Sequence, residues 1–128
     1  MEQIFIGIDV SKAVLDICVS GGDNEYFVIK NKTDEILKFF EQFLDQKIVI
    51  GVENTGRYNW SLYQAMVKLK LPLAVLNPLH LKRSMGLVRG KTDKDDAFRI
   101  AQFIKKNKDE LSYWNPISKS IQRLQVLL

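Results

Sequence analysis

The feature that most constrains this chain is a change in hydrophobic period about a quarter of the way along it. Before that point three strand-like segments, residues 4–10, 13–20 and 26–29, are separated only by short turns. Connections this short favour antiparallel pairing, so the segments predict a three-stranded meander. Residues 4–10 are apolar on both faces, which is typical of a central strand covered on both sides.

Beyond the meander, helices alternate with strands. Thr33 is predicted to cap a helix, and strands at 47–53 and 73–76 flank a second helix at 58–70. The apolar stripe of the first helix consists of Ile36, Leu37, Phe40, Phe43 and Leu44. Such alternation predicts parallel pairing through right-handed crossovers. A meander followed by two parallel strands is the order of a ribonuclease-H-like α/β fold, with a five-stranded mixed sheet flanked by helices.

Positive charge is concentrated in one segment. Residues 79–108 contain nine basic and three acidic residues, whereas the rest of the chain contains ten basic and twelve acidic ones. The segment therefore carries +6 and the remainder −2, which gives the net charge of +4. A basic edge attracts phosphates, so it predicts nucleic-acid binding; a solvated basic surface without a ligand is the alternative. The predicted nucleic-acid contacts are Lys12, Arg57, Tyr58, Lys82, Arg83, Arg89, Lys91 and Lys94.

The end of the chain has a different character. A helix is predicted from Thr92 to about Asn107, and residues 1–110 are expected to form one domain. Residues 111–128 are expected to begin a helical, coiled-coil segment, because apolar residues recur there at intervals of four and three. These residues are Ile117, Ile121, Leu124 and Leu128. The stripe runs to the last residue, so we expect a fragment or a helix that needs a partner.

Several classes of protein are excluded or disfavoured. The single cysteine, Cys18, has no intrachain partner, which excludes a disulfide scaffold and a cysteine-based zinc site and favours a reducing cytoplasm. No apolar run approaches the ~18 residues of a membrane span, and no secretory signal precedes the first strand. We therefore expect a cytoplasmic protein that associates with the nucleoid when it binds DNA.

Two carboxylates stand at the ends of predicted strands. Asp9 lies near the end of the first strand and Glu53 ends the fourth. In the predicted order these strands are parallel neighbours, so both side chains reach the same rim of the sheet, where sites in α/β folds are built. Asp9 and Glu53 are therefore expected side by side.

The predicted helix at residue 92 adds two more carboxylates. Asp93 and Asp96 continue its core-facing stripe, whereas Asp95 points nearly opposite. A capping box from Thr92 to Asp95 explains Asp95 but not Asp96. Carboxylates gathered in this way repel unless a hard cation such as Mg²⁺ or Mn²⁺ neutralises them. Four carboxylates holding two ions are suited to phosphodiester cleavage.

The motifs around these acids resemble a known family. Residues 6–12, 52–58, Asn77-Pro78 and 89–97 are similar, in order and spacing, to the RuvC-like N-terminal domain of the DEDD transposases of the insertion-sequence 110 family. Relatives of that family include the Piv-type DNA invertases. The resemblance implies a RuvC-like fold and a metal-dependent DNA recombinase with Asp9, Glu53, Asp93 and Asp96 as its metal-binding acids. It also implies a structured bridge RNA as guide, a multimer, and a C-terminal domain with a catalytic serine that this sequence does not contain.

Three other functions are weighed. A stand-alone nuclease similar to a Holliday-junction resolvase would use the same acids without transposition, and a binding module would hold guide RNA and DNA without catalysis. Actin-like and sugar-kinase ATPases share the opening Gly-x-Asp strand, but they need a second phosphate loop and a much longer chain.

The aromatic residues and the single histidine are expected to have structural roles. Trp60, Tyr63 and Met66 share one helix face and are expected in the core rather than as a base-stacking platform. Trp114 is expected to cover the core or to meet a partner subunit, and His80 to lie at the surface or to pack.

Overall fold

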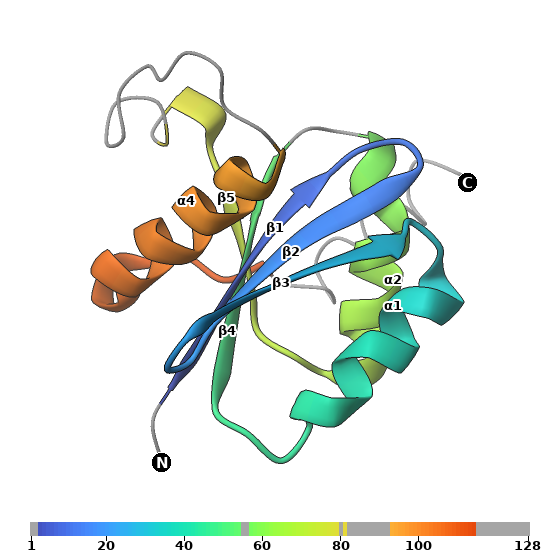
Figure 1. The fold of residues 1–128 in the computed structure, drawn as a ribbon, viewed down its shortest axis with the longest axis horizontal. Coiled ribbons are helices and arrows are strands. Elements are labelled where there is room, and N and C mark those ends of the chain that lie inside the picture. Colours follow the sequence, from blue (N-terminus) through green and yellow to red (C-terminus); the bar gives the residue numbers. More distant parts are fainter. Residues whose placement is uncertain (1–2, 55–56, 80, 82–92, 115–128) are drawn as a thin grey trace, which may run out of the picture.

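The computed structural model describes residues 3–54, 57–79, 81 and 93–114. Within these residues the chain forms one five-stranded sheet with helices on both faces (Figure 1). The strands are β1 (Ile4–Val10), β2 (Val14–Ser20), β3 (Asn24–Lys30), β4 (Ile48–Glu53) and β5 (Leu73–Leu76). The helices are α1 (Thr33–Phe40), η1 (Glu41–Phe43), η2 (Arg57–Asn59), α2 (Trp60–Leu69), α4 (Asp93–Lys106) and η3 (Lys108–Glu110).

The strand order is β3-β2-β1-β4-β5. β1 pairs antiparallel with β2, and β2 pairs antiparallel with β3, which confirms the predicted meander. β1 pairs parallel with β4, and β4 pairs parallel with β5, which confirms the predicted parallel pairing. β1 therefore lies at the centre of the sheet.

Two apolar layers sandwich the sheet. On one face α1 and α2 cover side chains of alternating strand positions, among them Ile6, Ile8 and Ile50, which are fully buried. On the other face α4 covers Phe5, Val49 and Ala74 with its own Ile100 and Ile104. Alternating strand side chains point to opposite faces, so successive residues of β1 serve the two layers in turn.

Three sequence predictions for the α1–α2 layer were wrong in detail. Thr33 does not cap α1: it lies in the helix, and its hydroxyl donates to Oε1 of Gln64 at 2.9 Å. α1 ends at Phe40 and a 3-10 turn follows, which rotates Leu44 out of the stripe and leaves it 48% exposed. Trp60 is 44% exposed because it begins α2, outside the packed length of the helix.

Some expectations fall outside the described residues. The stripe of Ile117, Ile121, Leu124 and Leu128 lies there, as do His80 and most of the basic segment before α4. Among the helices of the described residues, none is long and apolar enough to span a membrane.

Candidate nucleic-acid and metal site

A row of carboxylates crosses the sheet at the carboxyl end of β1. The register pairs Asp9 with Asp16 on β2, and Ile8 with Val52 on β4, so Glu53 is the next residue beside Asp9. We call Asp16, Asp9 and Glu53 the acidic row. The three residues stand on three adjacent strands. Because neighbouring strands lie about 4.8 Å apart, each backbone position in the row is about that far from the next.

A row of small residues lies two positions earlier on the same face. Gly7 pairs with Cys18 and with Gly51, and Gly51 pairs with Ala74. α4 rests directly on this row: a Cβ at Gly7 would overlap the carbonyl oxygen of Ala97 and the nitrogen of Ala101. Side chains repeat on one face every second residue, so the acidic row faces the same side of the sheet as α4.

The direction of α4 brings its first turn toward the acidic row. Phe5 packs with Ile100 and Ile104, whereas Gly7, further along β1, meets Ala97 and Ala101. α4 therefore runs opposite to β1. One helical turn rises about 5.4 Å and two strand residues about 6.6 Å, so the turn before Ala97 reaches the level of Asp9.

Helical periodicity places the two predicted acids of α4 over different strands. Asp93 precedes Ala97, which lies over Gly7 of β1, by one turn. Asp96 precedes Ile100, which lies over Gly51 of β4, by one turn, and its side chain is half-buried. Asp95 is exposed, as predicted. The backbone thus directs the first turn of α4 to the acidic row.

No assembled metal centre is found among the side chains that the structure describes. Within that set, no three His, Cys, Asp or Glu side chains are grouped closely enough to hold an ion. Asp93 is described by its place in α4 and not by its side chain. The donor set is nevertheless chemically uniform: carboxylates are the ligands that Mg²⁺ and Mn²⁺ prefer.

Two asparagines fix the loops at this end of the sheet. The buried Asn59 donates from Nδ2 to the carbonyl oxygen of Glu53 at 3.0 Å. Asn31 donates from Nδ2 to the carbonyl oxygens of Ser11 (2.8 Å) and Tyr58 (3.0 Å). The turn after β1 and the segment after β4 are therefore held together.

The predicted nucleic-acid contacts are described only in part. Lys12 is exposed in the β1–β2 turn, and Tyr58 is half-buried in η2, where the backbone of Arg57 also lies. Lys94 is exposed, and its Nζ lies 4.2 Å from the centre of the Tyr26 ring. The predicted contacts that lie outside the described residues are Lys82, Arg83, Arg89 and Lys91.

Asp16 was not singled out from the sequence, although a signal was present. It lies between the buried Leu15 and Ile17, as a residue on the opposite face of a strand does. A tight turn between the first two strands places it opposite Asp9. Counting the hairpin register would therefore have added it to the acids at the rim.

Cys18 belongs to the packing beneath α4. It is fully buried with Ala97 and Ala101. Burial raises the pKa of its thiol, although a hydrogen bond with the side chain of Tyr26 acts in the opposite direction. The thiol is therefore kept protonated, as expected of a structural cysteine.

Comparison with known proteins gives one family and one fold. The model of a transposase family, the DEDD transposases of insertion-sequence 110, matches residues 6–128. RuvC of T. thermophilus in complex with a Holliday junction substrate is 14% identical, with a TM-score of 0.62 over 88% of this chain and 99% of that one. Thermus thermophilus RuvC in a second structure is 15% identical, with a TM-score of 0.58 over 89% and 100% of the two chains. No match to a curated protein is found. The predicted ribonuclease-H-like fold is confirmed.

Proposed function

Because the chain belongs to the insertion-sequence 110 family of DEDD transposases, we propose that it is the catalytic domain that cleaves and exchanges DNA strands during transposition. The observation that carries this proposal is the meeting of two elements at one rim. Asp9 lies one residue before the end of β1 and Glu53 ends the adjacent parallel strand β4, and the first turn of α4, with Asp93 and Asp96, is directed at them.

The proposed metal ligands are Asp9 and Glu53 from the sheet and Asp93 and Asp96 from α4. Their oxygens fit one or two ions of Mg²⁺ or Mn²⁺. Bound ions would supply charge neutralisation and activation of a nucleophile for an in-line displacement at phosphorus. The chain itself orients the ligands: the buried Asn59 fixes the backbone of Glu53, and Gly7 lets α4 lie close to β1.

The proposed substrate is DNA, selected with the help of a structured guide RNA, and the proposed assembly is a homo-oligomer. The support is the charge of +6 in residues 79–108, beside the acids of α4, together with the family. Lys12 lies in the turn after β1, so it adds a cation at the same rim. We place this activity in the cytoplasm, on the nucleoid.

The metal site can be tested by thermal unfolding. Mn²⁺ at 100 times its Kd should stabilise the folded chain by about 2.7 kcal/mol, which is a rise in Tm of roughly 10 °C for a domain of this size. Asp9→Asn should abolish the rise. Asp95→Asn is the matched control and should keep the rise. Asp95 lies in the same turn of α4 as the proposed ligands Asp93 and Asp96, but its side chain is exposed. A full rise in Asp9→Asn, or its loss in Asp95→Asn, contradicts the assignment.

A second candidate, cleavage of branched DNA without a guide, is favoured by the similarity to a RuvC structure that contains a Holliday junction. Junction DNA is incubated with the chain in Mg²⁺, with and without guide RNA, beside Asp9→Asn. Cleavage without RNA that Asp9→Asn abolishes favours this second function. Transposition by the protein that survives alanine at both Asp9 and Glu53 excludes catalysis by these acids and leaves a binding module.

A further inference from the structure

The first turn of α4 consists entirely of charged residues. These are Asp93, Lys94, Asp95 and Asp96, and the buried side chains that the structure describes in α4 begin only at Ala97. This turn has no apolar residue to pack on the sheet, its carboxylates repel one another, and the first amides of a helix lack an acceptor within it. Local opening of α4 should therefore start at the turn that carries two acids of the proposed metal site.

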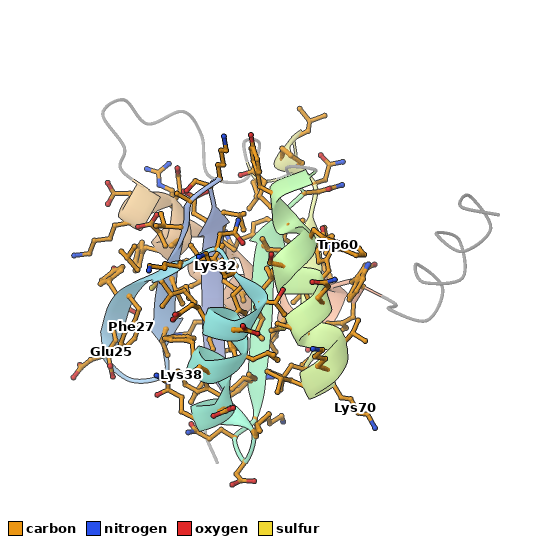
Figure 2. All side chains as sticks on the ribbon, turned by 90° about the vertical axis from the view of Figure 1, so that its right-hand side faces the viewer. Glu25, Phe27, Lys32, Lys38, Trp60 and Lys70 are labelled. Carbon is orange, nitrogen blue, oxygen red and sulfur yellow. The ribbon has the colours of Figure 1, made fainter. Side chains whose placement is uncertain are left out.

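One contact from this turn to the sheet is a cation above an aromatic ring. The Nζ of Lys94 lies 4.2 Å from the centre of the Tyr26 ring, within the range of about 6 Å at which the face of a ring attracts a cation. Tyr26 is on β3, the edge strand beside β2 (Figure 1). Figure 2 labels its neighbours on that strand, Glu25 and Phe27. The contact therefore joins the start of α4 to the edge of the sheet.

The Tyr26 side chain is itself held on the sheet. Tyr26 pairs with Cys18 of β2, and their side chains share a hydrogen bond. Cys18 is fully buried with Ala97 and Ala101, which lie about one and two turns after Lys94 in α4. The side chains of Lys94, Tyr26 and Cys18 thus form a chain of contacts that runs from the charged first turn to the packed middle of the same helix.

We infer that Tyr26 is a positioning residue for the proposed metal site: its ring holds the ammonium of Lys94, and with it the turn that carries Asp93 and Asp96. The inference rests on the proposed function. Lys94 lies between the two acids in one helical turn, so a hold on its side chain limits the movement of both. Without ions the acids repel, and the ring then opposes the opening of the turn. Tyr26 acts through Lys94 and needs no contact with an ion or with DNA.

The test measures amide hydrogen exchange by NMR in EDTA. Amides of residues 97–99 donate to the carbonyls of residues 93–95 and so report opening of the turn. Tyr26→Val removes the ring but keeps a residue that favours strands. It should speed exchange at residues 97–99 about two- to fivefold and leave residues 104–106 unchanged. Tyr26→Phe keeps the ring and should restore the wild-type rates.

A double-mutant cycle and a matched control make the result specific. Lys94→Met should speed the exchange as Tyr26→Val does, and the two changes together should add nothing further. Tyr113→Val is the control and should leave exchange in α4 unchanged, because Tyr113 is an exposed aromatic residue that bridges to β5. Unchanged exchange in Tyr26→Val, an equal rise in Tyr113→Val, no rescue by Tyr26→Phe, or additive effects in the double variant each overturn the inference.

Mn²⁺ titration by calorimetry shows whether the hold on the turn serves the acids. Tyr26→Val should raise the Kd for Mn²⁺ about twofold, because ion binding then includes closing the turn. Faster exchange with an unchanged Kd would also overturn the positioning role. Absence of Mn²⁺ binding in the wild type would contradict the proposed metal site itself, whereas the exchange rates in EDTA still decide whether Tyr26 holds the turn.

Discussion

At the scale of single residues, the facing carboxylates Asp9 and Asp16 are expected to lower the stability of the metal-free protein. They are directly paired across β1 and β2, and Glu53 stands on the other side of Asp9. Like charges at directly opposed positions destabilise a sheet. A sheet selected only for stability would place an apolar or neutral residue at position 16.

Asp16→Asn should therefore stabilise the metal-free protein. Removing one charge from the acidic row should raise stability by about 0.5 kcal/mol and Tm in EDTA by roughly 2 °C. The measurement is calorimetry in EDTA, with Asp23→Asn, an exposed residue of the β2–β3 turn, as the control that should not move. A fall in Tm for Asp16→Asn would mean that its other interactions outweigh the repulsion.

At the scale of elements, the position of α4 is set by backbone packing. Gly7 is where helix and strand come into contact, and a Cβ there would overlap backbone atoms of Ala97 and Ala101. Backbone atoms cannot turn aside as the end of a flexible side chain can. Any side chain at position 7 therefore pushes the helix away from the sheet, and with it Asp93 and Asp96.

Gly7→Ala should lower the free energy of unfolding by about 1–3 kcal/mol, the usual cost of overpacking. It should also reduce the rise in Tm with Mn²⁺, because the acids of α4 move from the acidic row. Urea unfolding and the Mn²⁺ experiment measure the two effects. Gly22→Ala is the control, since a Cβ at Gly22 meets nothing within 4 Å. A Gly7→Ala variant that is as stable as wild type would contradict the close contact.

The strand order and the positions of the helices could be predicted because they follow from the local spacing of apolar residues and from the lengths of the turns. The hairpin of β1 and β2 and the parallel pair of β1 and β4 were correct for this reason. Local pattern did not reveal where α1 ends, so Leu44 was placed in its stripe, nor that Trp60, in the first turn of the helix predicted at 58–70, is exposed. Both depend on packing between helices distant in sequence.

In the proposed site, too, some residues could be placed from local sequence pattern and others could not. Asp9 and Glu53 could be placed together because a parallel register needs only the strand order. Asp16 required the hairpin register, which depends on the length of the turn. How close α4 lies to the sheet depends on the contact between Gly7 and Ala97. The periodicity of neither segment predicts that contact.

At the scale of the whole molecule, the proposed site and Lys70 lie at opposite ends of the sheet. The acids lie at the carboxyl ends of β1 and β4, followed in sequence by the basic segment, while Lys70 ends α2 just before β5 begins. β5 is parallel to β4, so Lys70, labelled in Figure 2 at the lower end of α2, lies at the amino ends of these strands, whereas the acids lie at their carboxyl ends. Nucleic acid should therefore meet one end of the molecule only.

The salt dependence of DNA binding tests this polarity. Each phosphate contact releases counterions and adds about 0.9 to the slope of log K against log salt on duplex DNA. Replacing Arg89 and Lys91 by Gln should lower the slope by about 1.8, whereas Lys70→Gln should leave it unchanged. A fall in slope of about 0.9 with Lys70→Gln, half that of the double variant, would show that the net charge of +4, and not its placement, attracts DNA. A changed affinity at constant slope would instead assign these cations to contacts other than phosphates, because only displaced counterions make binding depend on salt.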